Sequence, residues 1–74
     1  MASANKINNK VRECRFFANE MTQQDLAERV GVTRQTIMAI EKGKYSPSLE
    51  VAFKIALVFQ KSLETVFSYD GAIE

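Results

Sequence analysis

Histidine is absent from this 74-residue chain, and Cys14 is its only cysteine. Zinc sites draw mainly on histidine and cysteine, and a Ser–His or Cys–His catalytic pair needs the imidazole as its base. The nine carboxylates have the spacing of ordinary helix surfaces and form no suggestive pair. We therefore expect no enzyme, no metal site and no cofactor.

With one cysteine, the chain has no internal disulfide. A free cysteine is usually a small buried apolar residue, and this is the role that we expect for Cys14. The alternative is a redox-sensing thiol, which requires a cation-rich and partly exposed surrounding.

Long apolar runs are also missing. No run approaches the ~18 residues of a membrane span, and the first ten residues, MASANKINNK, lack the apolar core of a signal peptide. We therefore expect a single-domain cytoplasmic protein that has no contact with a membrane. A chain of this length builds a core that supplies only ~3–5 kcal/mol, so we expect association of subunits to add stability.

Positive charge is absent from the end of the chain. Residues 62–74 carry Glu64, Asp70 and Glu74 but no lysine or arginine. Residues 1–61 hold all ten basic residues against six acidic ones, a net charge of +4. This asymmetry indicates an anionic partner for the body of the domain.

Capping residues and apolar spacing predict five short helices, and hence an all-α domain. The first helix is capped by Asn8 or Asn9 and runs to about Ala18. Thr22 caps the second helix, which Gly31 ends; Thr33 caps the third, which runs to about Lys42; and Ser62 caps the fifth. Residues 46–48 (SPS) open the fourth helix, with Pro47 in its first turn. The tail from Ser68 is predicted as strand or coil.

The fourth helix, at about residues 48–59, is apolar nearly all round. Its apolar side chains are Leu49, Val51, Ala52, Phe53, Ile55, Ala56, Leu57, Val58 and Phe59. A helix that is hydrophobic on every side is usually central in the core, and this is the position that we predict.

The second and third helices are separated by only Gly31, Val32 and Thr33. A connection this short, with glycine in it, sets two helices at a steep angle, as in a helix-turn-helix. At 100° per residue, Ile37 and Ile40 define the buried side of the third helix. The outer side then carries Gln35, Met38, Ala39 and Lys42, with Arg34 beside them in the first turn.

That outer side is suited to reading DNA. A glutamine amide pairs with the N6/N7 edge of adenine, and arginine pairs with guanine or with phosphate. Gln23 lies beside the free N–H groups that begin the second helix, a natural place for a phosphate. Lys42, Lys44 and Tyr45 follow the third helix and would hold the backbone on its far side. The alternative is an ordinary solvated surface.

Four stretches together resemble a known family. They are residues 22–27 (TQQDLA), 31–37 (GVTRQTI), 40–44 (IEKGK) and 46–49 (SPSL). They are similar to the small phage-repressor/Cro type of helix-turn-helix regulator, the xenobiotic-response-element group, and especially to its short stand-alone dimeric repressors. The resemblance covers about residues 8–69.

The resemblance implies a compact five-helix repressor-like domain at residues 8–69, with or without a short terminal β-strand pairing. It leaves a flexible segment at residues 1–7 and a tail at 70–74. It further implies a homodimer whose helix at about 33–42 enters the major groove of double-stranded DNA. Arg34, Gln35, Met38 and Ala39 would then face bases, and Gln23, Thr33, Thr36, Lys42, Lys44 and Tyr45 would contact phosphates. An Arg15–Glu41 pair would tie the reading helix to the scaffold.

The fifth helix is late, short and apolar, so we expect a dimer interface of Leu63, Val66, Phe67 and Tyr69. Two positions depart from the family pattern. The segment from Phe16 to Met21 is one residue longer than the commonest spacing. Gln60 stands where relatives usually carry glycine, and glutamine disfavours positive φ, so we expect a different form of turn there.

These features favour a sequence-specific DNA-binding transcriptional repressor, with a regulatory protein as a further partner. An antitoxin that neutralises a toxin is the alternative from another class. A controller protein of a restriction–modification system is the alternative within DNA binding.

Overall fold

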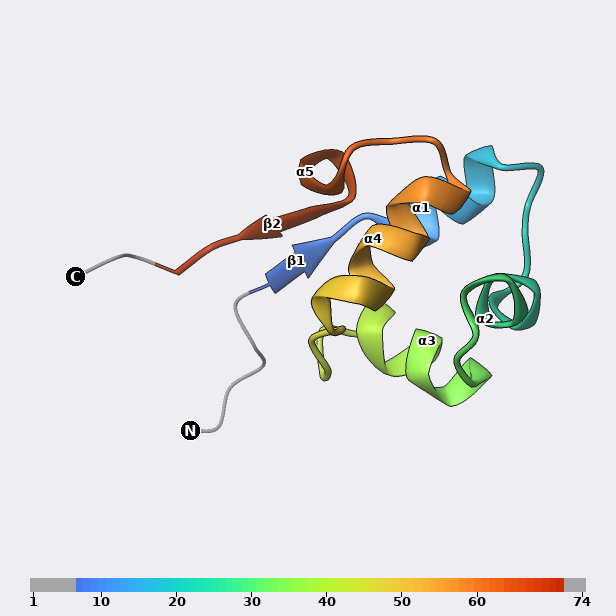
Figure 1. Ribbon diagram of the computed structural model, residues 1–74, viewed down its shortest axis with the longest axis horizontal. Helices are drawn as coiled ribbons and strands as arrows, with labels where there is room; N and C mark the ends of the chain where they lie inside the picture. Colours follow the sequence, from blue (N-terminus) through green and yellow to red (C-terminus); the bar gives the residue numbers. More distant parts are fainter. Residues whose placement is uncertain (1–6, 72–74) are drawn as a thin grey trace.

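The computed structural model describes residues 7–71, which form five helices and two short strands (Figure 1). In chain order these are β1 (Ile7–Asn9), α1 (Val11–Phe17), α2 (Gln23–Val30), α3 (Arg34–Glu41), α4 (Leu49–Val58), α5 (Leu63–Val66) and β2 (Phe67–Tyr69). The molecule is thus a mostly helical domain, as the sequence predicts, with a small added sheet.

Side-chain caps fix where four of the helices begin. The hydroxyls of Thr22, Thr33 and Ser62 accept the N–H of the residue three positions on, which confirms all three as N-caps of α2, α3 and α5. Ser48 caps α4 in the same way. Pro47 therefore precedes the cap of α4, and its prediction in the first turn of that helix is wrong.

The first helix begins later than the sequence suggests because residues 7–9 pair with β2. The two strands are antiparallel, with Ile7 opposite Tyr69 and Asn9 opposite Phe67. Neither Asn8 nor Asn9 is the N-cap residue of α1; that position is Lys10, which makes no side-chain cap bond. Asn9 still satisfies one backbone N–H at the N-terminal end of α1, since its Oδ1 accepts the N–H of Val11 at 3.1 Å. Residues 1–6 of the predicted flexible segment and residues 72–74 of the tail lie outside the described residues.

The core lies where the five helices meet. Its largest fully buried side chains come one or two from each helix: Val11, Leu26, Ile37, Ile40, Ile55 and Val66. α2 packs most extensively against α3, and α4 packs against α2 and α5. None of the helices within residues 7–71 has both the length and the apolar character needed to cross a membrane.

α4 is less central than its composition predicts. Ala52, Ile55 and Ala56 are buried, but Leu49, Phe53 and Leu57 are 66%, 53% and 74% exposed. The helix therefore turns one apolar side to the core and another outward, which corrects the expectation that it is buried all round.

Two turns adopt the left-handed backbone typical of glycine at residues that are not glycine. Gln60 adopts a φ of 57°, so the turn after α4 takes the left-handed form after all, and the expectation of another form is wrong. Two bonds close that turn, from the N–H of Gln60 to Leu57 and from the N–H of Lys61 to Ala56. In the longer α1–α2 turn, Asn19 and Glu20 have φ of 65° and 58°, so the extra residue is taken up by left-handed backbone.

Candidate nucleic-acid interface

α2 and α3 meet at a turn built on Gly31. Gly31 has a φ of 80° and its N–H bonds to the carbonyl of Ala27, a conformation that glycine adopts without the steric cost of a Cβ. Leu26, Ala27 and Val30 of α2 and Ile37 and Ile40 of α3 are buried. The inner sides of both helices are thus fixed in the core, which leaves the opposite side of α3 outward.

The outer side of α3 carries the residues expected to face bases. Arg34 and Gln35 are exposed, and Met38 and Ala39 are half-buried. Lys42 follows the helix and is exposed. The structure therefore groups an amide, a guanidinium, a small methyl and a thioether on one accessible helix face, which suits base edges in a major groove.

Thr33 and Thr36 are engaged with each other. The Thr33 hydroxyl accepts the N–H of Thr36 at 3.1 Å, and the two hydroxyl oxygens lie 3.0 Å apart. Thr33 is exposed and Thr36 half-buried at the beginning of α3. One hydroxyl of this pair still has hydrogen-bonding capacity for a phosphate.

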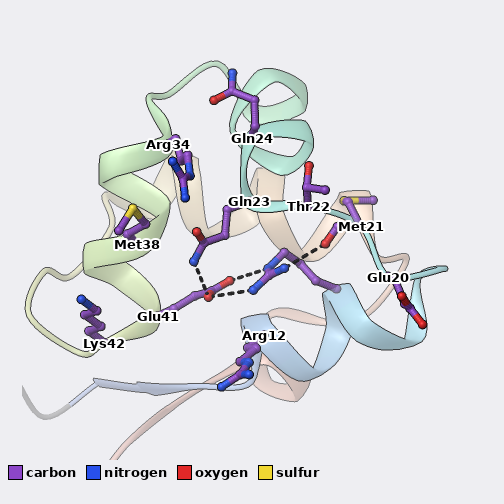
Figure 2. Close-up of a pocket in the computed structure, with 11 residues that line it drawn as sticks. Arg12, Glu20, Met21, Thr22, Gln23, Gln24, Arg34, Met38, Glu41 and Lys42 are labelled. Atoms are coloured by element: carbon purple, nitrogen blue, oxygen red, sulfur yellow. Dashed lines mark hydrogen bonds and ion pairs between the residues drawn. The ribbon is translucent and has the colours of Figure 1, made fainter.

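A hydrogen-bonded network joins α1, α2 and α3 at the carboxylate of Glu41 (Figure 2). Arg15 donates from Nε to Oε2 at 2.6 Å and from Nη2 to Oε1 at 3.0 Å. Gln23 donates from Nε2 to Oε1 at 3.0 Å. The Nη1 of Arg15 donates to the carbonyl of Met21 at 2.9 Å. The pair that the family resemblance implies is therefore present, and Gln23 belongs to it as well.

Burial makes this network structurally important. The side chains of Arg15 and Glu41 are only 15% and 8% exposed, and removing one partner of such a pair leaves the other charge poorly solvated. The two-pronged geometry also fixes orientation. Gln23 consequently presents its amide in a set direction, with one Nε2 hydrogen still available for a phosphate.

An open hollow of about 920 Å³ lies beside this network, between α1 and the outer side of α3. Its lining includes Arg12, Arg34 and Lys42, which Figure 2 shows around the Glu41 network, and the acids Glu20 and Glu41. Arginine and lysine side chains around such a hollow suit an anionic backbone.

Arg12 belongs to this surface although the sequence reasoning did not select it. It is exposed on α1 and lines the hollow. Arg12 and Arg15 are three residues apart, so they share one face of α1. That spacing is the signal that would have identified Arg12 once Arg15 was placed against α3.

Lys44 and Tyr45 lie beyond the end of α3. Gly43 adopts a φ of 74°, and the N–H of Lys44 returns to the carbonyl of Ala39 at 3.0 Å. Lys44 and Tyr45 are both exposed. Accessible polar groups therefore lie at both ends of α3: Arg34 at its start, and Lys42, Lys44 and Tyr45 at its end, where Gln23 of α2 also bonds to Glu41.

The four residues expected at a dimer interface do not share one environment. Tyr69 is exposed and Leu63 half-buried, but Val66 and Phe67 are only 1% and 9% exposed. The side chains of Val66 and Phe67 pack in the core of their own chain, and a role of the four residues in a dimer interface stays a prediction.

Cys14 is buried in α1. Burial raises the pKa of its thiol, and the opposing effect of Lys61 is smaller. A protonated buried thiol fits the apolar role rather than the redox-sensing one.

Comparison with known proteins gives one family and several relatives. The helix-turn-helix family model matches residues 11–66. An uncharacterised helix-turn-helix-type transcriptional regulator of Methanocaldococcus jannaschii is 53% identical over 64 residues, which span 86% of this chain and 96% of the relative. The similarly described YgzD of Bacillus subtilis is 51% identical over 82% of this chain and 91% of its own length. The transcriptional repressor RstR of the cryptic phage CTXphi, from Vibrio cholerae, is 37% identical over 68% of this chain and 44% of its own.

Proposed function

Because the chain belongs to the helix-turn-helix family, we propose that it is a DNA-binding transcriptional regulator that represses its target gene. It reads a specific operator in the major groove and does so as a homodimer. The two α3 helices then enter successive major grooves of a two-fold-related site, ~34 Å apart.

The observation that carries this proposal is the outer side of α3. Arg34 and Gln35 project from the first turn of a helix whose opposite side, through Ile37 and Ile40, is fully buried. An accessible helix face with an amide and a guanidinium at its start is suited to reading base edges. Repression, rather than activation, is supported by the named repressor RstR among the relatives.

Polar and basic groups around α3 support its docking on the DNA backbone. Gln23, held by Glu41, lies with Arg12 and Lys42 around the hollow beside α3, and Lys44 and Tyr45 are exposed just beyond the end of the helix. Contacts of this kind fix the register of a helix in the groove without carrying sequence information. Base contacts from Arg34, Gln35, Met38 and Ala39 then supply the sequence preference.

The test is selection of bound sequences from a random pool of duplex DNA with the purified protein. We expect an enriched palindrome whose half-sites are one helical turn apart. Enrichment of a single, unrepeated site would contradict the two-fold arrangement. Recovery of no consensus would contradict sequence-specific reading altogether.

Repression is tested separately, with the selected palindrome placed over a reporter promoter. Expression of the protein should lower reporter output, and an Arg34→Ala/Gln35→Ala variant should not. A rise in reporter output would show that the protein activates its target gene and does not repress it.

A further inference from the structure

A stripe of apolar side chains runs along the outer side of α4. Leu49, Phe53 and Leu57 follow one another at four-residue spacing, and each is more than half exposed. Residues four apart lie on one helix face. Scattered apolar residues are normal on a surface, but a contiguous line of large ones marks an interaction site.

Two hollows lie beside this stripe, between α4 and α5. One, of about 520 Å³, is lined by Leu49, Ala52 and Leu63, and by residues of β2 that include Tyr69. The other, of about 480 Å³, is lined by Phe53, Ala56 and Leu57, with Leu63 again at its border. The small side chains of Ala52 and Ala56 leave room there for a large side chain from outside.

We propose that a second copy of the chain docks on this face, with the two α4 helices antiparallel about a two-fold axis that passes near Phe53. This inference rests on the homodimer of the proposed function and assigns its interface. The stripe is symmetric about Phe53, so reversing its direction exchanges Leu49 and Leu57. Leu57 of one copy then reaches the hollow beside Leu49 of the other, and Leu49 reaches the hollow beside Leu57. A two-fold interface requires such self-complementarity.

The charges along one edge of the stripe select the antiparallel arrangement. Glu50 and Lys54 form an ion pair of 3.3 Å on the surface beside Leu49 and Phe53. In the antiparallel arrangement Glu50 of each copy faces Lys54 of the partner subunit. In a parallel two-fold arrangement this edge would face the opposite edge of the partner's stripe, so neither residue would meet its counter-charge. Opposite charges that meet across an interface favour the arrangement that brings them together.

The other edge shows the same complementarity. Lys61 borders the hollow beside Leu57, whereas Glu64 borders both hollows. Reversal brings Lys61 of the partner subunit to the hollow beside Leu49, where Glu64 lies. Leu63 and Tyr69 then lie at the rim of the interface, and Phe53 at its centre.

The first experiment is sedimentation equilibrium of the wild type and of Leu57→Glu. We expect a wild-type dimer and a monomeric variant that keeps its helical circular dichroism, because Leu57 is exposed in the single chain. Phe16→Glu is the matched control, since Phe16 is 62% exposed on α1 and lines neither hollow beside the stripe; it should remain dimeric. A dimeric Leu57→Glu, or a monomeric wild type at micromolar concentration, would overturn the proposal.

A cysteine at the axis tests the geometry directly. In a Cys14→Ser background, Phe53→Cys should form an intermolecular disulfide under mild oxidation, since position 53 meets itself and bridged Cα atoms lie within about 7 Å. Leu49→Cys should not link to itself, because it faces Leu57. Efficient linkage of Leu49→Cys with none of Phe53→Cys would exclude this axis.

Charge reversal tests the antiparallel direction. Lys54→Glu and Glu50→Lys should each weaken dimerisation by about three- to tenfold, and the double variant should restore it, because two exposed ion pairs are broken and then re-formed with exchanged signs. A parallel dimer would not bring Glu50 to Lys54 of the partner subunit, so unchanged dimerisation in both single variants would contradict the proposed direction.

These outcomes separate the interface from the DNA-binding proposal. If Leu57→Glu disrupts the dimer but the wild-type protein selects no DNA sequence, the proposed interface is supported and sequence-specific DNA binding is refuted. A Leu57→Glu variant that binds a selected palindrome as tightly and as cooperatively as the wild type would refute the interface and keep the DNA reading.

Discussion

Gln35 is the residue at which base reading is most directly testable. It is exposed in the first turn of α3, and its amide can donate to and accept from one base edge at once. Gln35 does not cap α3, because the Thr33 hydroxyl already accepts the N–H of Thr36 at the N-terminal end of the helix. Its removal should therefore affect binding and leave folding unchanged.

We expect Gln35→Ala to weaken binding to the selected operator by ~1–3 kcal/mol. Binding to random duplex DNA should change much less, because that binding depends on phosphate contacts. Titration of both DNAs at one salt concentration measures the difference. Equal losses on the two would remove Gln35 from the base-reading set.

The structure predicts that the thiol of Cys14 reacts slowly with a disulfide reagent. Because burial raises the thiol pKa, the folded chain holds less thiolate at pH 8 than the unfolded chain, so a disulfide reagent should react more slowly with it. The native state retains the proton more strongly, and this contributes stability that is present below the ordinary pKa of about 8.5 and lost as pH rises.

The difference in the free energy of unfolding between the wild type and Cys14→Ala should accordingly become smaller above pH ~8.5. Denaturant unfolding between pH 7 and 10 measures it, and reagent kinetics in and out of denaturant measure the reactivity. Equal reaction rates in the folded and unfolded chain would show that Cys14 is accessible.

At the scale of elements, the residues that the sequence locates best are those that act locally. Thr22, Thr33 and Ser62 cap helices through a bond to a backbone N–H three residues away, which depends on no distant part of the chain. The outward side of α4 was not predictable in this way. Leu49, Phe53 and Leu57 are as apolar as Ile55, and only the packing of the other helices decides which side is covered. Arg12, by contrast, could have been found from its three-residue spacing to Arg15, since the family resemblance already pairs Arg15 with Glu41 of α3.

The turn between α4 and α5 contains strain that glycine would remove. A non-glycine residue in the left-handed region costs ~1–2 kcal/mol, and the added freedom of glycine in the unfolded chain costs ~0.4–1 kcal/mol. We expect Gln60→Gly to stabilise the domain by about 0.5–1 kcal/mol in thermal or denaturant unfolding. Gly43→Ala, which imposes the reverse change at a φ of 74°, should destabilise it. Loss of stability in Gln60→Gly would show that the glutamine side chain contributes more than its backbone costs.

At the scale of the whole molecule, the surface divides into a polar, basic side around α3 and an apolar side along α4. The first offers cations to an anionic backbone, and affinity there should depend strongly on salt. The second is the stripe that the proposed interface covers. A small domain thus uses separate surfaces for DNA and for its own second copy.

The salt dependence of DNA binding by the whole protein tests whether Lys44 contacts a phosphate. Lys44→Ala should weaken binding to specific and random DNA alike. It should also lower the slope of log K against log salt by about 0.9 for each phosphate that the lysine of one subunit no longer neutralises. Titrations at four salt concentrations measure the slope. An unchanged slope would remove Lys44 from the residues that bind phosphate.

The pairing of β1 with β2 also has a consequence for the order of folding. It joins the two ends of the described chain, with Asn8 bonded to Asp70 62 positions away, and the N–H of Lys10 bonded to the carbonyl of Val66 at 2.8 Å. Closing so long a loop has an entropic cost that the local α2–α3 contacts avoid. We therefore expect the strands to form last and open first, so that amide hydrogens of β1 and β2 exchange with solvent sooner than those of Ile40 and Ile55. Because Tyr69 and Phe67 lie beside the stripe on α4, the second copy would be released by the same local opening.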